Sequence, residues 1–281
     1  MSVIEGHVRS TARYIARDGA RHRFMRGPAD DRSVVFHDMR GAPDQPRLDR
    51  EGFALVQHTS AVTDFSDADE VANIYLPELR KLVQQLTKSE LVFMQPGWVL
   101  RADDGRSFNA TRLPGGKSVT TLATGQIIHV DYTPDSAGDF AKLSFASAGL
   151  SARPKGRLVG FNFWRAITPP PQDKPLALLD RRSVDPDDFI VTDMGMATSE
   201  MGDGTFRGNQ WLNYQLAYNP AHRFCWWRDM TRDEVLVFVQ YEEGGGPVSG
   251  IAHTAFINPD CPPGTPPRES IEARAYAFVE N

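Results

Sequence analysis

The sequence predicts a mainly β protein with a double-sheet core of the jelly-roll or cupin-like kind and a helical region near its N-terminus. Two observations lead to this class. From about residue 90 onward, short apolar runs of strand length alternate with clusters of Gly and Pro. Before that point, one stretch carries apolar residues at helical spacing instead. A helix-bearing segment followed by many short strands is typical of two packed sheets. We therefore expect a single domain over residues 1–281, with a strand and helix region at 1–90 and a β core at 91–281.

The N-terminal region is expected to contain one strand and one helix. Residues 52–62 (GFALVQHTSAV) are interpreted as a strand. Ser66 is a good N-cap residue, and from Asp67 to Thr87 apolar residues recur at helical spacing with charges between them. Pro77 is expected to kink or split this helix, because proline lacks a backbone N–H and its ring collides with the preceding turn.

The β core is expected to be built from strand-like runs at residues 157–167, 210–218, 223–230, 234–243, 248–257 and 270–280. The second and third runs flank the turn NPAH and predict a hairpin, and the fourth and fifth predict another across a longer GGGP loop. The last run alternates small or aliphatic residues with a second set that includes Ser270, Glu272 and Arg274. Since side chains alternate along a strand, that second set shares one face.

Composition excludes several function classes. Hydrophobic residues make up 41% and charged residues 24%, and the net charge of −5 comes without any basic block suited to nucleic acid. The apolar runs are too short to span a bilayer, and MSVIEGHVRS carries charges where a secretion signal needs an apolar segment. Cys225 and Cys261 form no Cys-x-x-Cys motif. We expect a cytoplasmic protein without a nucleic-acid or membrane partner.

The stretch IIHVDYT (127–133) contains a candidate metal site. His129 and Asp131 would share one face of a strand, so they can be two metal ligands or simply a hydrogen-bonded pair. The triplet alone is weak evidence, because chance produces it easily. The 2-His-1-carboxylate triad of non-heme Fe(II) oxygenases also needs a second histidine far downstream. His253 lies in the strand-like run IAHTAF and meets this requirement, whereas His222 lies in an expected turn. The predicted ligands are therefore His129, Asp131 and His253.

A second pattern concerns 2-oxoglutarate, the co-substrate of many such iron enzymes. Its distal carboxylate needs a buried partner, and a guanidinium with a nearby hydroxyl supplies charge-assisted hydrogen bonds. Arg268 and Ser270 in PRESI have a suitable Arg-x-Ser spacing and follow His253 in the chain. Arg274 lies on the Ser270 face of the same run and is a second candidate. Arg268 is favoured because it pairs with Ser270 in the usual motif order.

Four segments of the core carry a resemblance to a known enzyme family: FNFWR (161–165), HRFCWWRDMTRDEVLVF (222–238), HTAFINP (253–259) and PPRESIEARAYAF (266–278). The chain resembles the Fe(II)/2-oxoglutarate-dependent oxygenases. More narrowly, it is similar to the microbial hydroxylase/desaturase family of natural-product tailoring enzymes, which includes a cephamycin 7α-hydroxylation component. The resemblance runs from about residue 58 to the C-terminus. It implies a double-stranded β-helix, Fe(II), 2-oxoglutarate and O₂. It also implies hydroxylation, desaturation or oxidative cyclisation of a small molecule in secondary metabolism.

Candidate substrate contacts are Asn162, Trp164 and Arg165 in the run 157–167, and His58 in QHTS. Core packing is an equally reasonable role for the Trp-Arg pair.

Two other function classes remain open. One is a cupin-like metal-dependent hydrolase or isomerase, in which the same ligands hold Zn²⁺ and activate water. It requires no arginine to anchor a carboxylate. The other is a non-catalytic binding module, which would usually have lost one of the three ligands. The sequence also leaves open whether the chain forms a homo-oligomer.

Overall fold

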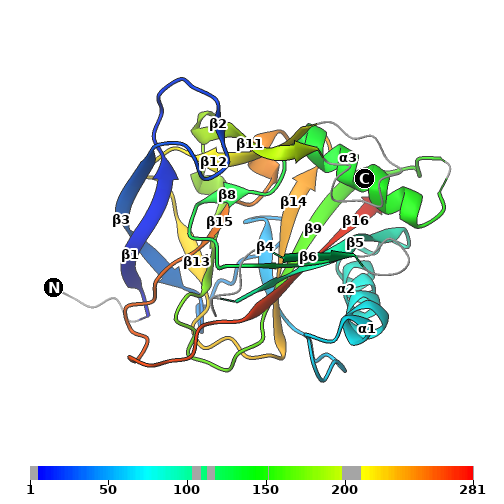
Figure 1. Cartoon of the computed structure of the whole chain (residues 1–281), viewed down its shortest axis with the longest axis horizontal. Helices are drawn as coiled ribbons and strands as arrows, with labels where there is room; N and C mark the ends of the chain where they lie inside the picture. Colours follow the sequence, from blue (N-terminus) through cyan, green and yellow to red (C-terminus); the bar gives the residue numbers. More distant parts are fainter. Residues whose placement is uncertain (1–5, 103–108, 113–117, 151, 198–209, 281) are drawn as a thin grey trace.

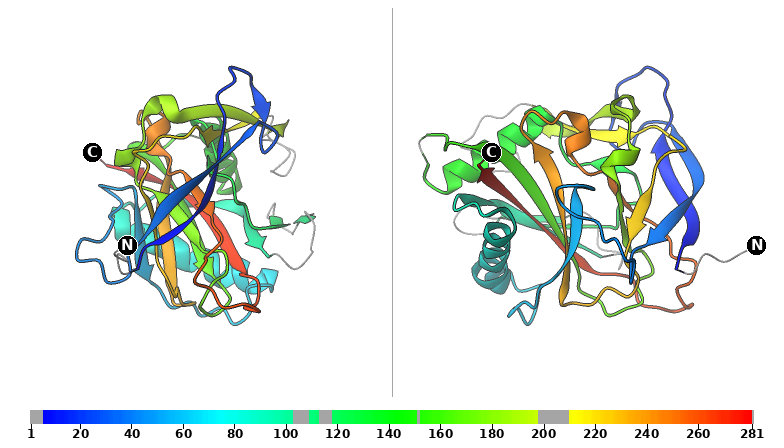
Figure 2. Two further views of the ribbon diagram at one scale, coloured as in Figure 1. Left: turned by 90° about the vertical axis from the view of Figure 1, so that its left-hand side faces the viewer. Right: turned by 180° about the vertical axis from the view of Figure 1, so that it is seen from behind.

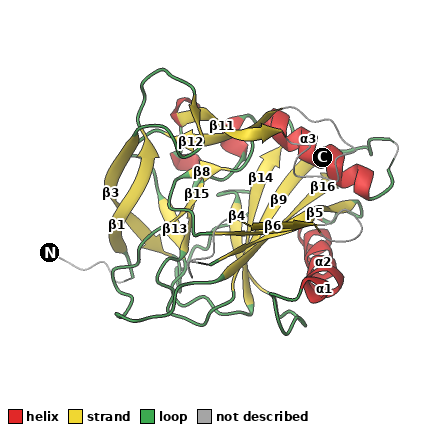
Figure 3. Cartoon of the chain, viewed as in Figure 1, coloured by secondary structure: helices red, strands yellow, loops and turns green. Residues whose placement is uncertain are grey.

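Two β-sheets make up most of the computed structural model, which describes residues 6–102, 109–112, 118–150, 152–197 and 210–280 (Figure 1, Figure 3). Within these residues the strands are β1 (Val8–Ile15), β2 (His22–Arg23), β3 (Ala29–Asp38), β4 (Phe53–Gln57), β5 (Val92–Arg101), β6 (Asn109–Arg112), β7 (Ser118–Leu122), β8 (His129–Val130), β9 (Arg157–Ala166), β10 (Leu176–Leu179), β11 (Phe189–Ala197), β12 (Gln210–Leu216), β13 (Phe224–Trp226), β14 (Glu234–Glu242), β15 (His253–Ala255) and β16 (Ser270–Val279).

The described strands form one nine-stranded and one seven-stranded sheet. Their orders are β1-β3-β13-β10-β15-β8-β12-β11-β2 and β4-β14-β9-β16-β5-β7-β6. Most neighbouring strands are antiparallel, and β9 is buried along nearly its whole length between β14 and β16 of the smaller sheet. Figure 1 and the view from behind in Figure 2 place β1 and β3 at one end of the molecule and α2 (Leu76–Thr87) at the other. This double sheet confirms the predicted mainly β class.

The N-terminal helical region begins at Ala68, one residue later than predicted. It consists of α1 (Ala68–Glu70), a π-helical turn η1 (Val71–Tyr75) and α2. The prediction of Ser66 as the N-cap is wrong. The Ser66 hydroxyl donates to the Asp64 carboxylate, and it is Asp67 whose side chain accepts from the first N–H groups of α1. The local sequence DFSD offers Ser66 and Asp67 as capping side chains. Because the Ser66 hydroxyl is bound to Asp64, Asp67 forms the cap.

Pro77 divides this helical region, as predicted. It occupies the first turn of α2, directly after η1, where the N–H of Leu76 bonds to the carbonyl of Val71. The wider π turn accommodates a residue that has no N–H of its own. Leu79 and Val83 are buried on α2, which packs against β16 and β5. None of the described helices is long and apolar enough to cross a membrane.

The strand-only expectation after residue 90 misses one helix. α3 (Pro134–Ser147) follows β8 and packs against β5 and β12. Thr133 is its N-cap and Pro134 stands in its first turn, so a start signal was present in the sequence. The remaining described helices are the short 3₁₀ segments η3 (Arg181–Ser183), η4 (Pro186–Asp188) and η6 (Pro247–Ser249). Strands β1 to β3, within residues 1–51, were also not predicted.

Both predicted hairpins are wrong. β12 pairs with β11 and β8, whereas β13 pairs with β10 and β3, so NPAH joins strands that are not neighbours. β14 belongs to the seven-stranded sheet and β15 to the nine-stranded sheet. Turn residues reverse the chain locally, but they do not determine which sheet receives the next strand. The first predicted strand is shorter than expected, at Phe53–Gln57.

The crossing from β14 to β15 places the second histidine. At Gly250 a Cβ would lie 2.6 Å from Val130 Cγ1 and 2.8 Å from the carbonyl oxygen of Gln240, so only glycine allows the two sheets to approach this closely. Three residues later, His253 lies directly opposite His129 in the β15–β8 pairing. Two residues far apart in sequence thus become cross-strand neighbours.

Candidate metal centre

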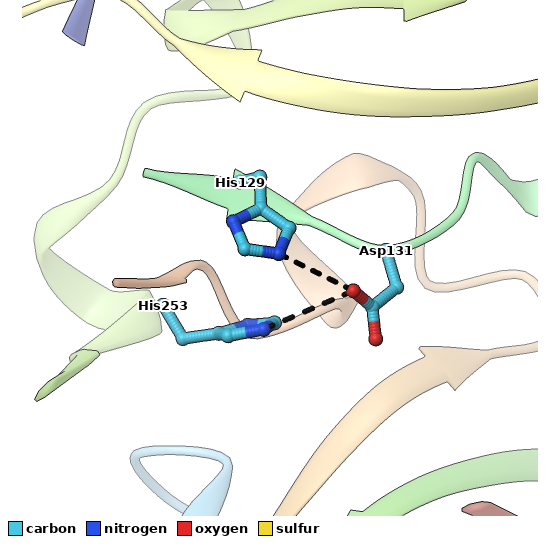
Figure 4. A group of neighbouring side chains, drawn as sticks. All are labelled: His129, Asp131 and His253. Carbon is cyan, nitrogen blue, oxygen red and sulfur yellow. Dashed lines mark ion pairs between the residues drawn. The ribbon is translucent and has the colours of Figure 1, made fainter. Parts of the chain in front are cut away.

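The side chains of His129, Asp131 and His253 meet in the interior (Figure 4). His129 and His253 come from β8 and β15, and Asp131 follows directly after β8. Asp131 Oδ1 lies 3.4 Å from His129 Nε2 and 3.8 Å from His253 Nε2. All three residues are buried, and one potential ligand atom of each lies within 4.8 Å of the others. The structure therefore brings together the three predicted metal ligands.

Backbone hydrogen bonds orient both imidazoles. His129 Nδ1 lies 2.7 Å from the carbonyl oxygen of Ile127, and His253 Nδ1 lies 3.1 Å from that of Ile251. A carbonyl only accepts, so each Nδ1 carries the proton and each Nε2 presents its lone pair toward Asp131. Burial, assisted by the neighbouring imidazole of His129, lowers the pKa of His253 to about 4. A neutral imidazole with a free Nε2 is the form that binds a metal.

The two oxygens of Asp131 have different partners. Oδ2 accepts from Arg274, Asn162 and Gln240, at 2.8, 3.2 and 2.6 Å respectively. Oδ1 is the oxygen that faces the histidines (Figure 4). Burial by itself raises the pKa of this carboxyl, but the charge of Arg274 outweighs it and holds the pKa well below its usual range. Asp131 is therefore a carboxylate at neutral pH.

Arg274 belongs to a short chain of charged side chains, of which Asp131, Arg274 and Glu272 are buried. Besides Asp131, its Nη2 contacts Glu272 Oε2 at 3.3 Å, and Glu272 Oε1 accepts from Arg101 Nε at 2.6 Å. Cations and anions alternate along this chain, which offsets the desolvation of each group. Arg274 is thus held between two carboxylates.

Arg268, His129 and His253 line the same cavity. His129, His253, Trp164, Arg268 and Glu272 are among the residues that line it. Arg268 is 2% exposed, and its guanidinium lies 5.1 Å from the centre of the Trp164 ring and donates to Thr124 Oγ1 at 3.0 Å. A buried cation stacked on an indole is well placed to bind one end of a dicarboxylate whose other end lies near the histidines.

Ser270 is fully buried, and its hydroxyl has no hydrogen-bond partner among the described residues. It lines a neighbouring cavity, and Arg101 borders both cavities. A buried hydroxyl without a partner is costly, and this one would be satisfied by an additional acceptor such as a carboxylate oxygen. The orphaned hydroxyl and the stacked guanidinium fit a dicarboxylate co-substrate.

The four candidate substrate residues separate into two groups. Asn162 contacts Asp131, and Trp164 lies against Arg268 in the cavity. Arg165 donates to Tyr75 Oη at 3.2 Å and to the backbone oxygen of His58 at 2.9 Å. The cavity beside the histidines brings together Trp164 and Arg268, whereas Arg165 and His58 contact each other elsewhere.

Residues 7–278 match the model of a family described as "Oxidoreductase/YMDC permease-like domain". The chain belongs to this family. Its relatives in sequence include the alpha-ketoglutarate-dependent dioxygenase phiK of Fungal sp., which is 27% identical over 88% of this chain and 83% of the relative. The hydroxylase/desaturase efuI of Hormonema carpetanum is 29% identical over 88% and 84%.

A solved structure shares the fold. The iron and alpha-ketoglutarate-dependent endoperoxidase NvfI superimposes with a TM-score of 0.77 at 22% identity and covers 98% of this chain and 99% of that one. The Fe(II)/2-oxoglutarate-dependent dioxygenase nvfI of Aspergillus novofumigatus is also a sequence relative, 26% identical over 87% of this chain and 82% of the relative. These relatives confirm the predicted jelly-roll-like core and the predicted oxygenase class of the hydroxylase/desaturase kind.

The family's iron fits the donor set of this chain. Two neutral imidazoles and one carboxylate are the ligand types that hold non-heme Fe(II), and here they converge in a buried setting. Sequence reasoning missed three residues that support this set, namely Gln240, Glu272 and Arg101. Glu272 shares the strand face of Arg274 and was visible in the alternation. Gln240 and Arg101 had no sequence signal, because only the folded sheets bring them to the site.

Proposed function

We propose that this oxygenase binds Fe(II) through His129, Asp131 and His253 and holds the distal carboxylate of 2-oxoglutarate with Arg268 and Ser270. The observation that carries the proposal is the shared cavity, which has both histidines and the Arg268 guanidinium in its wall. The distal carboxylate would bind Arg268, and the opposite end of the co-substrate would lie near the histidines.

The protein's part in the reaction is to hold and orient. Bound Fe(II) and 2-oxoglutarate supply the oxidising chemistry, which uses O₂ and releases succinate and CO₂. His129 and His253 present Nε2 because their Nδ1 protons are held by backbone carbonyls. Asp131 remains ionised and presents Oδ1. Trp164 covers the Arg268 guanidinium and excludes water from it, which strengthens its interaction with a carboxylate.

The proposed substrate is a small organic molecule of secondary metabolism. One relative is named as a hydroxylase/desaturase and one solved structure as an endoperoxidase, and all three of these reactions are oxidations. The chain has no basic block that would favour nucleic acid. The hydrolase or isomerase alternative explains neither the buried Arg268 nor the Ser270 hydroxyl, which has no partner within the part of the chain that the structure describes.

An anaerobic titration tests the metal and co-substrate assignment. Addition of Fe(II) and then 2-oxoglutarate to the protein should produce a weak visible charge-transfer band. His253→Ala should remain folded by circular dichroism and lack the band, because one of its three ligands is gone. The matched control is His22→Ala, which removes a histidine bound to Asp18 outside this cluster and should retain the band. A band of normal intensity in His253→Ala, or none in the unchanged protein, would contradict the assignment.

A further inference from the structure

The contacts of the Asp131 carboxylate converge on one of its two oxygens. Arg274 donates to Oδ2 from Nε at 3.1 Å and from Nη2 at 2.8 Å. Gln240 Nε2 donates at 2.6 Å and Asn162 Nδ2 at 3.2 Å, and Oδ2 is again the acceptor. The other oxygen, Oδ1, faces the two histidines. The carboxylate is therefore asymmetric before any ligand binds.

Three adjacent strands of the seven-stranded sheet supply these donors. Gln240 lies on β14, Asn162 on β9 and Arg274 on β16, and these strands are consecutive in the sheet. Asn162 and Arg274 stand directly opposite each other in the β9–β16 register. All three side chains are buried. Donors held by paired, buried strands occupy defined positions, whereas Asp131 follows the short β8 of the opposite sheet.

Arg274 is itself held from its other side. Glu272 lies two residues away on the same strand face and contacts Arg274 Nη2 at 3.3 Å, and Arg101 Nε binds Glu272 at 2.6 Å. Because a carboxylate flanks the guanidinium on each side, Arg274 is not available to bind a co-substrate without breaking an existing ion pair.

We infer that Arg274, together with Gln240 and Asn162, is a positioning group that makes Asp131 a metal ligand through Oδ1 alone. The inference rests on the proposed function, in which Asp131 binds the metal. Carboxylates bind metals through one or both oxygens. If Oδ2 also bound, it would occupy a coordination position that the facial triad leaves open for co-substrate and O₂. The N–H groups on Oδ2 keep that oxygen away from the metal.

The test uses Co(II) alone, without co-substrate, because its visible d–d spectrum responds to the number and arrangement of its ligands. Arg274→Gln and Gln240→Leu should each change this spectrum. Each should also weaken Co(II) binding by about 10–100-fold, the usual effect of removing a hydrogen-bonding partner of a metal ligand. Arg274→Lys, which keeps the charge but loses the two-nitrogen contact, should restore the affinity only in part.

Two control variants separate positioning from other effects. Arg268→Gln removes the proposed co-substrate anchor and should leave the Co(II) spectrum unchanged. Arg40→Gln removes an arginine from another buried carboxylate, Glu234 at the start of β14, where the pair is 2.6 Å apart. It should lower stability without altering the spectrum, since Glu234 is not one of the proposed ligands.

The outcomes are distinct. Unchanged spectra and affinities in both Arg274→Gln and Gln240→Leu would show the inference to be wrong. If Arg274→Gln does not fold, Gln240→Leu decides, because it leaves the Arg274–Asp131 ion pair in place. If the unchanged protein binds no Co(II), the metal site itself is refuted and the inference with it. If the unchanged protein binds Co(II) and both variants bind it with the same affinity and spectrum, only the positioning role is refuted and the metal site stands.

Discussion

At the scale of single residues, Arg268 and Arg274 are both buried arginines near or within β16, but their guanidinium groups have different partners. Arg268 stacks on Trp164 and lines the cavity beside the histidines. Arg274 binds the carboxylates of Asp131 and Glu272. Motif order favoured Arg268 as the co-substrate anchor. The contacts of Arg274 provide an independent reason to assign the anchor to Arg268, because Asp131 and Glu272 already neutralise the charge of Arg274.

This difference predicts separate kinetic effects. Arg268→Ala should raise the KM for 2-oxoglutarate far more than the KM for the organic substrate, because the anchor contacts only the co-substrate. Loss of one partner of a buried charge pair costs about 3–5 kcal/mol, which corresponds to roughly two to three orders of magnitude or more in affinity. Ser270→Ala should show a smaller effect of about 1.5–3 kcal/mol, because it removes one hydrogen bond to a charged group. Steady-state assays of succinate formation measure both constants.

The matched comparison is Arg274→Ala in the same assay. It should act through metal binding and stability, and added Fe(II) should recover part of its activity. A co-substrate defect confined to Arg274→Ala, with Arg268→Ala near the unchanged protein, would contradict the assignment of the anchor.

At the scale of elements, the start of the N-terminal helical region depends on one side chain. Asp67 accepts from the N–H of Asp69 at 2.8 Å and of Glu70 at 3.2 Å, whereas the Ser66 hydroxyl is bound to Asp64. A carboxylate at a helix N-terminus also interacts favourably with the helix dipole. The cap therefore depends on Asp67.

Asp67→Ala should lower the free energy of unfolding by about 0.5–2 kcal/mol, the range for loss of an N-cap. Ser66→Ala, one residue earlier, should change it by less, because its exposed contact caps no helix. Urea unfolding followed by circular dichroism compares the two variants directly. A larger loss in Ser66→Ala than in Asp67→Ala would restore the cap predicted from sequence.

The strand connections explain how distant ligands meet. Gly250 allows the chain to pass between β8 and β14, and His253 then pairs with His129. A hairpin at this point would have kept β15 in the sheet of β14. The hairpin predicted between residues 234–243 and 248–257 is wrong, and His253, which the structure brings into the ligand cluster, lies in the same segment.

At the scale of the whole molecule, the pH dependence of stability can be derived from a histidine away from the metal centre. His37 lies on β3, beside His7 and opposite Cys225 of β13. Burial, followed by the nearby charges of Arg223 and His7, lowers the pKa of His37 from 6.5 to about 4. Below pH 6.5 the unfolded chain therefore binds a proton that the folded protein does not bind until about pH 4. The contribution of His37 to the free energy of unfolding therefore has its full value above pH 6.5. It decreases progressively as the pH falls toward 4.

The free energy of unfolding of the metal-free protein should accordingly decrease between pH 6.5 and 4.5. His37→Gln, which keeps a polar side chain but does not titrate, should give a shallower decrease. Urea unfolding curves at several pH values in the presence of a chelator measure the slopes. Equal slopes for both proteins would show that His37 does not contribute to the decrease.

By itself, the sequence determined the mainly β class, the helix at residues 67–87 with its division near Pro77, and the set of candidate ligands and anchors. Local periodicity and motif order carry this information, because both depend on residues that are near one another or follow in a defined order. Only the tertiary structure decided which strands pair, and it showed that α3 interrupts the strands. It also placed Arg274 on Asp131, 143 residues away, and Gln240 beside it, 109 residues away. Such contacts arise when two sheets pack face to face, and spacing along the chain cannot predict them.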